Sequence, residues 1–191
     1  ALHRAPWDEH AVLDSVTELE GHRDNAAAAL LGGLAICAPG APAVQMNVPD
    51  ELRVVVFVPD SELATEQARK VVPHEFSRAD AVFNAARCAL LVRALLLRDW
   101  ATLGTAMEDR WHQPQRGALL PALAPMIAAA RAAGAAGASL AGAGPSVAAL
   151  SAGDHAAVGA ALQQAADQHG VGGRVLILAP RNFGARVDVH P

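Results

Sequence analysis

The segment from Glu18 to Asn25, with the sequence ELEGHRDN, gathers carboxylates, an imidazole and a carboxamide at a corner between two predicted helices. Oxygen ligands of this kind suit Mg²⁺, and a carboxylate can also hold an ammonium group. The same residue types form solvated helix ends and Asx caps. The corner therefore indicates either a site for a cation or an amine, or an ordinary helix start.

Two further segments place an arginine where it could bind an anion. In LATEQAR, Thr65 and Arg69 are four residues apart and share one face of a predicted helix. In DRWHQPQRGALLP, the residues His112, Gln113 and Arg116 lie in a predicted loop. A guanidinium group matches a carboxylate through two parallel hydrogen bonds, so either arginine could clamp one. The alternatives are a surface arginine and a plain loop.

A glycine-rich turn is the fourth candidate. The sequence Gly142-Ala143-Gly144-Pro145-Ser146 joins two predicted strands. The backbone N–H groups of such a turn could face a phosphate, although many glycine turns bind nothing. Arginines, carboxylates and a glycine turn would together suit an amino-acid substrate and a magnesium nucleotide.

The segments that must position these residues alternate between helix and strand patterns. Helices are expected where apolar residues recur at helical spacing, and strands where β-branched or short apolar runs occur. The expected helices are 7–20, an alanine-rich helix capped by Asp24 or Asn25, 66–71, 77–98, 100–109, 121–133 and 154–169. The expected strands are 34–38, 43–48, 52–58, a strand on each side of the glycine turn within 139–151, 174–180 and 185–190.

Two of these segments carry the clearest patterns. Ser77 and Asp80 form a capping-box-like helix start. One face of that helix is expected to hold Ala79, Val82, Phe83, Ala86, Leu90 and Leu97. The run RVVVFV within 52–58 is apolar on both faces, which predicts a covered central strand. Because the elements lack a regular βαβ rhythm, the predicted class is α+β, with helices packed on one face of a mainly antiparallel sheet.

Composition limits the classes of function. The chain has 191 residues, of which 52% are hydrophobic and 18% charged, with a net charge of −4. These values predict a folded core and argue against a disordered chain or a nucleic-acid binder. Cys37 and Cys88 suggest neither a disulfide framework nor a zinc site. Since no apolar run reaches the roughly 18 residues of a membrane span and ALHRAPWDEH does not resemble a signal peptide, we expect a soluble cytoplasmic protein.

Read in order, ELEGHRDNAAAALLGG, LATEQAR, SRADAVFNAARCALL, DRWHQPQRGALLP and AGAGPSVAAL resemble the homoserine kinases, a branch of the GHMP small-molecule kinase family. The resemblance implies a ferredoxin-like C-terminal domain over residues 41–191. Residues 1–40 would be the end of an N-terminal nucleotide and substrate domain. The implied reaction is transfer of the γ-phosphoryl group of ATP, with Mg²⁺, to the side-chain hydroxyl of L-homoserine, a step in threonine biosynthesis.

The resemblance also implies which residues handle the amino acid. His22 and Asp24 would bind L-homoserine, with Asp24 pairing with its ammonium group, and Asn25 would lie beside the reacting hydroxyl. Arg69 and Arg116 would hold the substrate carboxylate.

On the phosphate side, Glu18 would bind Mg²⁺, or Glu20 if the alignment is shifted by two residues. Thr65 would lie near the transferring phosphate. The residues implied to support the phosphate loop are Gly142, Gly144 and Ser146.

The chain departs from the family in several places. It contains no segment like the serine-rich phosphate loop P-x-x-x-G-L-G-S-S-A, so the resemblance implies a C-terminal portion without the N-terminal phosphate-loop domain. Arg23, Ala64 and Ala141 replace a usual proline and two usual serines. The alternatives are a non-catalytic amino-acid-binding module derived from the kinase, and a chain whose exposed apolar surface mediates self-association, for example as a homodimer. The missing N-terminal kinase domain would be a further partner.

Overall fold

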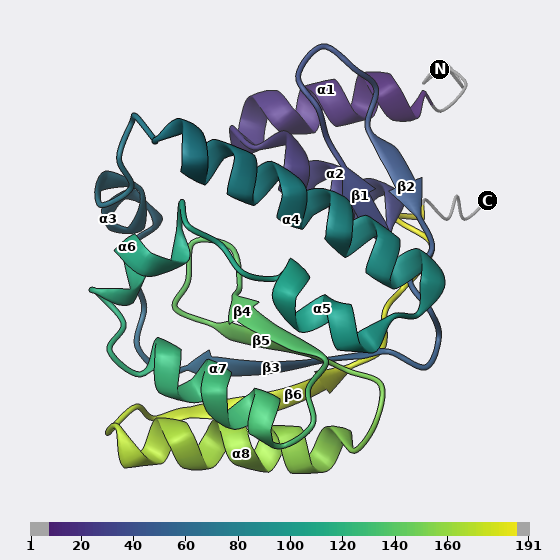
Figure 1. Cartoon of the computed structure of the whole chain (residues 1–191). Coiled ribbons are helices and arrows are strands. Elements are labelled where there is room, and N and C mark those ends of the chain that lie inside the picture. The colour runs from purple at the N-terminus through teal and green to yellow at the C-terminus, as the bar shows by residue number, and fades with distance from the viewer. Residues whose placement is uncertain (1–7, 187–191) are drawn as a thin grey trace, which may run out of the picture. The chain divides into compact units, whose positions relative to one another are not determined.

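A computed structural model describes residues 8–186, without the side chains of Glu9, His10 and Glu20 (Figure 1). The chain divides into two compact units. The first unit comprises residues 1–48 and 180–191, and the second comprises residues 49–179. The domain division expected after residue 40 falls within the first unit, between its two strands.

Among the described residues, the first unit contains two helices and a two-stranded antiparallel sheet. Its elements are α1 (Glu9–Glu20), α2 (Arg23–Leu31), β1 (Leu34–Ile36) and β2 (Val44–Met46). Leu13 of α1 and Ala26 and Ala27 of α2 are buried together and form its small core.

The C-terminal segment of the chain returns to this unit. The backbone N–H of Gly33 donates to the carbonyl of Arg181 at 2.8 Å, and that of Ala185 donates to Leu30 at 3.1 Å. The carboxamide of Asn182 bonds to both backbone groups of Val48, at 2.8 and 2.9 Å. The first unit is therefore built from both ends of the chain.

The second unit is built on a four-stranded antiparallel sheet in the order β4-β5-β3-β6. Its strands are β3 (Arg53–Pro59), β4 (Gly137–Leu140), β5 (Val147–Ser151) and β6 (Gly173–Leu178). Strand β3 lies between β5 and β6, and its Val55 and Phe57 are fully buried. This confirms the central strand that the run RVVVFV predicts.

Six helices complete the second unit within the residues that the structure describes. They are α3 (Thr65–Lys70), α4 (Arg78–Leu97), α5 (Trp100–Ala106), α6 (Gln113–Gly117), α7 (Leu123–Ala132) and α8 (His155–Gln168). Helices α7 and α8 pack on one side of the sheet (Figure 1), where Met126, Val158 and Leu162 are buried with Phe57. Helix α4 packs against α5, which in turn contacts β4. The predicted α+β class is confirmed.

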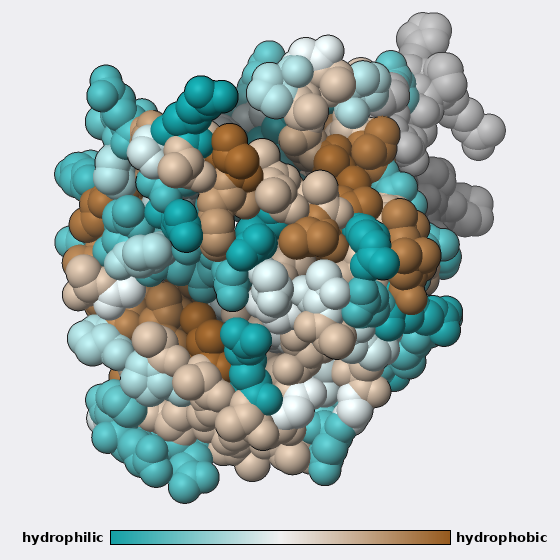
Figure 2. Space-filling model, viewed as in Figure 1, coloured by the Kyte–Doolittle hydropathy of each residue, from teal (hydrophilic) through white to brown (hydrophobic). Residues whose placement is uncertain are grey.

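Helix α4 confirms its predicted start but not its predicted apolar face. The Ser77 hydroxyl accepts a hydrogen bond from the N–H of Asp80 at 3.1 Å, as in a capping box. Full burial is limited to Ala94 and Leu95, near the end that packs on α5, whereas Val82 is 62% exposed. Apolar side chains gather over the C-terminal end of α4 (Figure 2), where Leu97 is 63% exposed. The other elements of the second unit therefore leave several apolar residues of α4 uncovered.

Two predicted segments differ from the structure. Residues 113–117 form helix α6 instead of a loop, because one turn is too short to show a hydrophobic period and other groups hold it in place. The strand expected over 185–190 does not begin at Ala185 or Arg186, and its other residues lie outside the described part of the chain. Across residues 8–186, no helix has both the length and the hydropathy of a membrane span.

Candidate functional site

The corner of the first unit is made by a glycine turn between α1 and α2. Gly21 has a φ of +75° and its N–H donates to Thr17, which ends α1. His22 follows in an extended conformation and is the N-cap of α2. The prediction that Asp24 or Asn25 caps this helix was wrong, because the left-handed glycine completes the reversal of the chain by residue 22. Asp24 instead lies in the first turn, where it accepts the N–H of Asn25 at 2.9 Å.

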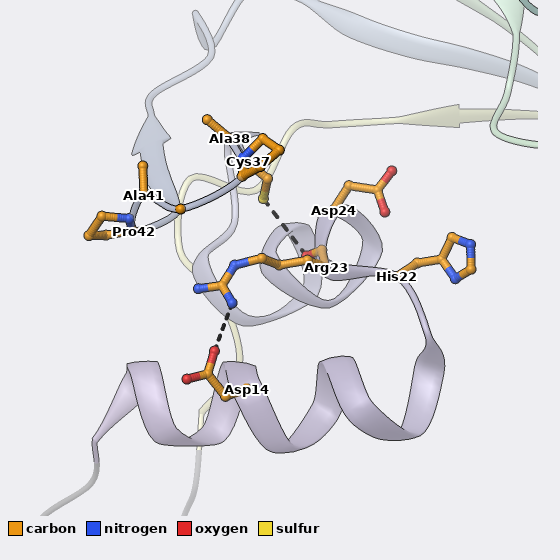
Figure 3. A pocket seen from close by; sticks show the side chains of 10 residues that line it. Asp14, His22, Arg23, Asp24, Cys37, Ala38, Ala41 and Pro42 are labelled. Carbon is orange, nitrogen blue, oxygen red and sulfur yellow. Dashed lines mark hydrogen bonds and ion pairs between the residues drawn. The ribbon is translucent and has the colours of Figure 1, made fainter. Parts of the chain in front are cut away.

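Beside this corner the first unit has an open hollow of about 620 Å³, lined by the start of α2 and by residues 37–42 (Figure 3). Arg23 extends back over α1 and pairs with Asp14 at 2.7 Å. The Cys37 thiol lies 3.8 Å from the carbonyl oxygen of Arg23. Figure 3 shows His22 and Asp24 pointing away from this ion pair. At this corner, His22 and Asp24 therefore point in different directions from Arg23 (Figure 3).

Glu18, the predicted magnesium ligand, is an exposed residue in the last turns of α1. In the described part of the chain, no three His, Cys, Asp or Glu side chains come together as a metal-binding group. Beside nucleotides, Mg²⁺ commonly binds one or two carboxylates and takes its other ligands from phosphate oxygens and water, a kind of site that a single exposed glutamate could join.

In the second unit, the short helix α3 carries Thr65 and Arg69. Thr65 is the first residue of the helix and Arg69 lies in its last turn. Both residues are exposed, and their spacing places them on one side of the helix. Ala64, at the N-cap, offers no side-chain cap.

Arg116 connects three candidate segments of the second unit. Its Nε donates to the carbonyl of Ala68 in α3 at 3.1 Å, and its Nη1 donates to the carbonyl of Gly142 at 2.9 Å. Arg116 itself belongs to α6. One guanidinium group therefore holds α3 and the glycine turn to α6. These bonds use two of the five guanidinium N–H donors, and the others can bind an anion.

The glycine turn between β4 and β5 is tightly closed. The N–H of Ala141 donates to Ser146 at 2.9 Å, and that of Gly144 donates to Ala141 at 3.0 Å. Gly142 and Gly144 have φ values of +56° and +92°, which other residues rarely adopt. Because the Gly144 N–H bonds within the turn, it does not point to a ligand here.

Asp109, which the sequence analysis did not select, is the most heavily bonded carboxylate of this region. It accepts the backbone N–H groups of Trp111, His112 and Gln113 at 2.8, 2.8 and 2.6 Å, and the Asn84 carboxamide at 2.8 Å. Burial alone would raise its pKa. The His112 imidazole and these hydrogen bonds outweigh burial and hold the pKa of Asp109 well below its usual value of 3.8.

Residues 91–171 match the family model described as GHMP kinases C terminal. The match lies within the second unit and identifies a GHMP kinase C-terminal domain in this part of the chain. The chain is similar to homoserine kinases from Synechococcus sp., with 40% identity over 98% of this chain and 63% of the relative, and from Microchaete diplosiphon, with 43% identity over 94% and 60%. The crystal structure of homoserine kinase from Cytophaga hutchinsonii superposes with a TM-score of 0.86 at 28% identity, over 94% of this chain and 60% of that one. The chain thus spans about three fifths of the length of these relatives.

Proposed function

We propose that this chain carries the amino-acid-binding part of a homoserine kinase, which transfers the γ-phosphoryl group of ATP to the side-chain hydroxyl of L-homoserine. The observation that carries the proposal is the position of Arg116. Its guanidinium group holds α3, the glycine turn and α6 together, and these are three of the segments that resemble homoserine kinases. The similarity to curated homoserine kinases over nearly the whole chain supports the same reading.

The substrate would be held at its two charged ends. Arg69 and Arg116 would bind its carboxylate, since a guanidinium group suits a planar anion. Asp24 would pair with its ammonium group beside His22, and Asn25 would lie next to the reacting hydroxyl. Placement of the hydroxyl for attack on the γ-phosphate is the main requirement of phosphoryl transfer.

The phosphate side would use other residues. Thr65 would lie close to the transferring phosphate, and the turn containing Gly142, Gly144 and Ser146 would support the phosphate loop. Mg²⁺, held by Glu18 and the nucleotide, would neutralise the charge that develops on the phosphate oxygens. The exposed carboxylate of Glu18 is compatible with such a shared ion. The reaction would serve threonine biosynthesis in the cytoplasm.

A second candidate is an amino-acid-binding module without kinase activity. Such a module would keep the substrate residues and lose turnover. Self-association as a homodimer is compatible with either function, and sedimentation would measure it.

ADP formation from ATP and Mg²⁺, measured with and without L-homoserine, tests the first candidate against the second. Isothermal titration of the chain with L-homoserine, with D-homoserine as the control, measures binding separately. Binding with homoserine-dependent turnover supports the kinase. Binding without turnover is expected both of the module and of a kinase part that lacks its phosphate-loop domain, and no binding contradicts both candidates.

Substitution of Glu18 tests the metal assignment. We expect Glu18→Ala to abolish the effect of Mg²⁺ on nucleotide binding while amino-acid binding stays. The reverse pattern would contradict the role given to Glu18. Glu66→Ala is the matched control, because Glu66 is an exposed glutamate that pairs with Lys70 at 2.7 Å.

A further inference from the structure

The strongest polar network outside the proposed ligand contacts surrounds Asp109. Its two carboxylate oxygens accept bonds in pairs: Oδ1 from Trp111 and Asn84, and Oδ2 from His112 and Gln113. The side chain is only 16% exposed. Three of these donors are consecutive backbone N–H groups at the start of α6, so the carboxylate fixes the path of the chain into that helix.

Helix α6 needs this external support. It has five residues, and its N-cap, His112, makes no side-chain cap bond. A single helical turn gains too few internal hydrogen bonds to offset the entropy of ordering it. The orientation of α6 is therefore set by the groups that hold its start, and Asp109 supplies three of those bonds.

The base of this network lies on α4. The Asn84 carboxamide donates to Asp109 and accepts the N–H of Arg110 at 3.1 Å. The guanidinium groups of Arg87 and Arg110 lie 4.0 and 3.9 Å from the centre of the Phe83 ring. The segment before α6 is thus fixed to a long, capped helix.

The other end of the network reaches the proposed ligand contacts. Gln113 accepts the N–H of Leu140 at 3.1 Å and donates to the carbonyl of Met107 at 3.2 Å, which ties α6 to β4 and to the end of α5. Arg116 then bonds to Ala68 and Gly142. Hydrogen bonds therefore connect α4 to Asp109 and Asp109 to the start of α6. The backbone of α6 then connects this start to the Arg116 guanidinium.

We propose that Asp109 is a positioning residue for Arg116: by fixing the start of α6, it sets the place and direction of the guanidinium group that receives the substrate carboxylate. Asn84 assists by holding Asp109 to α4. The inference rests on the proposed function, because it assigns Arg116 to an anionic part of the substrate. Asp109 itself does not touch the substrate and is no general base, since four donors occupy its oxygens.

Exchange of the Arg116 Nε–H proton tests the positioning without any ligand. NMR spectra of the ¹⁵N-labelled chain report this proton, and Arg116→Lys assigns its signal. We expect Asp109→Asn to raise its exchange rate about tenfold or more, because the bond to Ala68 opens when α6 loses its anchor. The matched control is Asp99→Asn. Asp99 also caps a helix, α5, by accepting from Thr102 N–H, and pairs with Arg93 at 2.7 Å, but α5 carries no proposed ligand residue.

Titration with L-homoserine provides the second readout. Asp109→Asn is expected to raise the dissociation constant about tenfold, whereas Asp99→Asn leaves it unchanged within about twofold. If Asp109→Asn does not fold, Asn84→Ala replaces it, because this change keeps a good helix former in α4 and removes one Asp109 contact.

An unchanged exchange rate of the Arg116 Nε–H proton in the folded variant overturns the proposal. Failure of the unaltered chain to bind L-homoserine contradicts the proposed function instead, and the exchange comparison then decides the positioning of Arg116 alone.

Discussion

The corner between α1 and α2 in the first unit and the region around Arg116 in the second unit differ in the hydrogen bonds that hold their candidate residues. At the corner, Asp24 and Asn25 are exposed neighbours in the sequence, and the Asn25 N–H donates to the Asp24 carboxylate. Arg116 bonds to partners 48 and 26 residues away, and Asp109 bonds to Asn84 at a separation of 25 residues. Local contacts leave side chains free to adapt to a ligand, whereas long-range bonds fix them beforehand. The candidate residues of the second unit are therefore pre-organised by its fold.

Replacement of Arg116 should have the largest effect on L-homoserine affinity and on stability. It tests the pre-organised residues of the second unit directly. We expect Arg116→Ala to weaken L-homoserine binding by about 2–5 kcal/mol, because the substrate carboxylate loses its partner. It should also lower the free energy of unfolding by about 1–3 kcal/mol, since the carbonyls of Ala68 and Gly142 lose their donor. Titration calorimetry and urea unfolding measure the two changes.

The control for this prediction is Arg174→Ala, since Arg174 is an exposed arginine on β6. It should change neither quantity appreciably. Unchanged affinity in Arg116→Ala would remove the carboxylate clamp from the proposed function, even if stability falls.

Acid should weaken the second unit through Asp109. Because the pKa of Asp109 in the folded chain lies below its usual 3.8, its contribution to stability is complete above about pH 5 and is lost as the pH falls toward the folded value. Bonds to a charged acceptor are each worth about 1.5–3 kcal/mol, which sets the scale of the loss. The measurement is the difference in unfolding free energy between the unaltered chain and Asp109→Asn at several pH values.

That difference should stay constant from pH 7 to about pH 5 and shrink below about pH 4. A difference that is the same at pH 7 and at pH 3 would show that the Asp109 carboxylate does not stabilise the fold through its charge.

Asp24 should differ from Arg116 in its effect on stability. We expect Asp24→Ala to change the free energy of unfolding by less than about 0.5 kcal/mol, because the exposed side chain makes only a local bond within residues 8–186. L-homoserine binding should weaken about tenfold, or about 1.4 kcal/mol, if Asp24 receives the ammonium group. A large loss of stability with normal binding would reverse the comparison between the two units.

A helix cap remote from the proposed ligand contacts should give the smallest effect. Asp154 accepts the N–H of Ala157 at 2.9 Å and caps α8. Asp154→Ala should cost about 1 kcal/mol of stability, as the loss of an N-cap usually does, and leave L-homoserine binding unchanged. Weaker binding in this variant would show that the affinity follows overall stability and not particular side chains.

Most of the fold could be predicted from local pattern. The Ser77–Asp80 cap, the central strand RVVVFV and the glycine turn each depend on residues close together in sequence, and the structure confirms all three. Helix α6 could not be predicted in this way, because its stability comes from contacts with α4, β4 and the glycine turn.

The candidate residues likewise differ in whether local sequence or tertiary contacts determine their positions. The sequence analysis selected Arg116 by its type and by resemblance, but its bonds to Ala68 and Gly142 depend on the tertiary fold. The pattern around Asp109 predicts a loop, and a loop alone indicates no role for its carboxylate. A usable signal was present: an aspartate four residues before Gln113 can accept the first N–H groups of a helix that has proline in its first turn.

The return of the C-terminal segment to the first unit has a consequence for synthesis of the protein. Leu30 and Gly33 leave the ribosome long before Arg181 and Ala185, their hydrogen-bond partners. The first unit can therefore be completed only after residues 180–185 have been synthesised. Residues 49–179 are continuous and can fold as they emerge, so the nascent chain would hold a finished second unit while α2 and β1 still lack these partners.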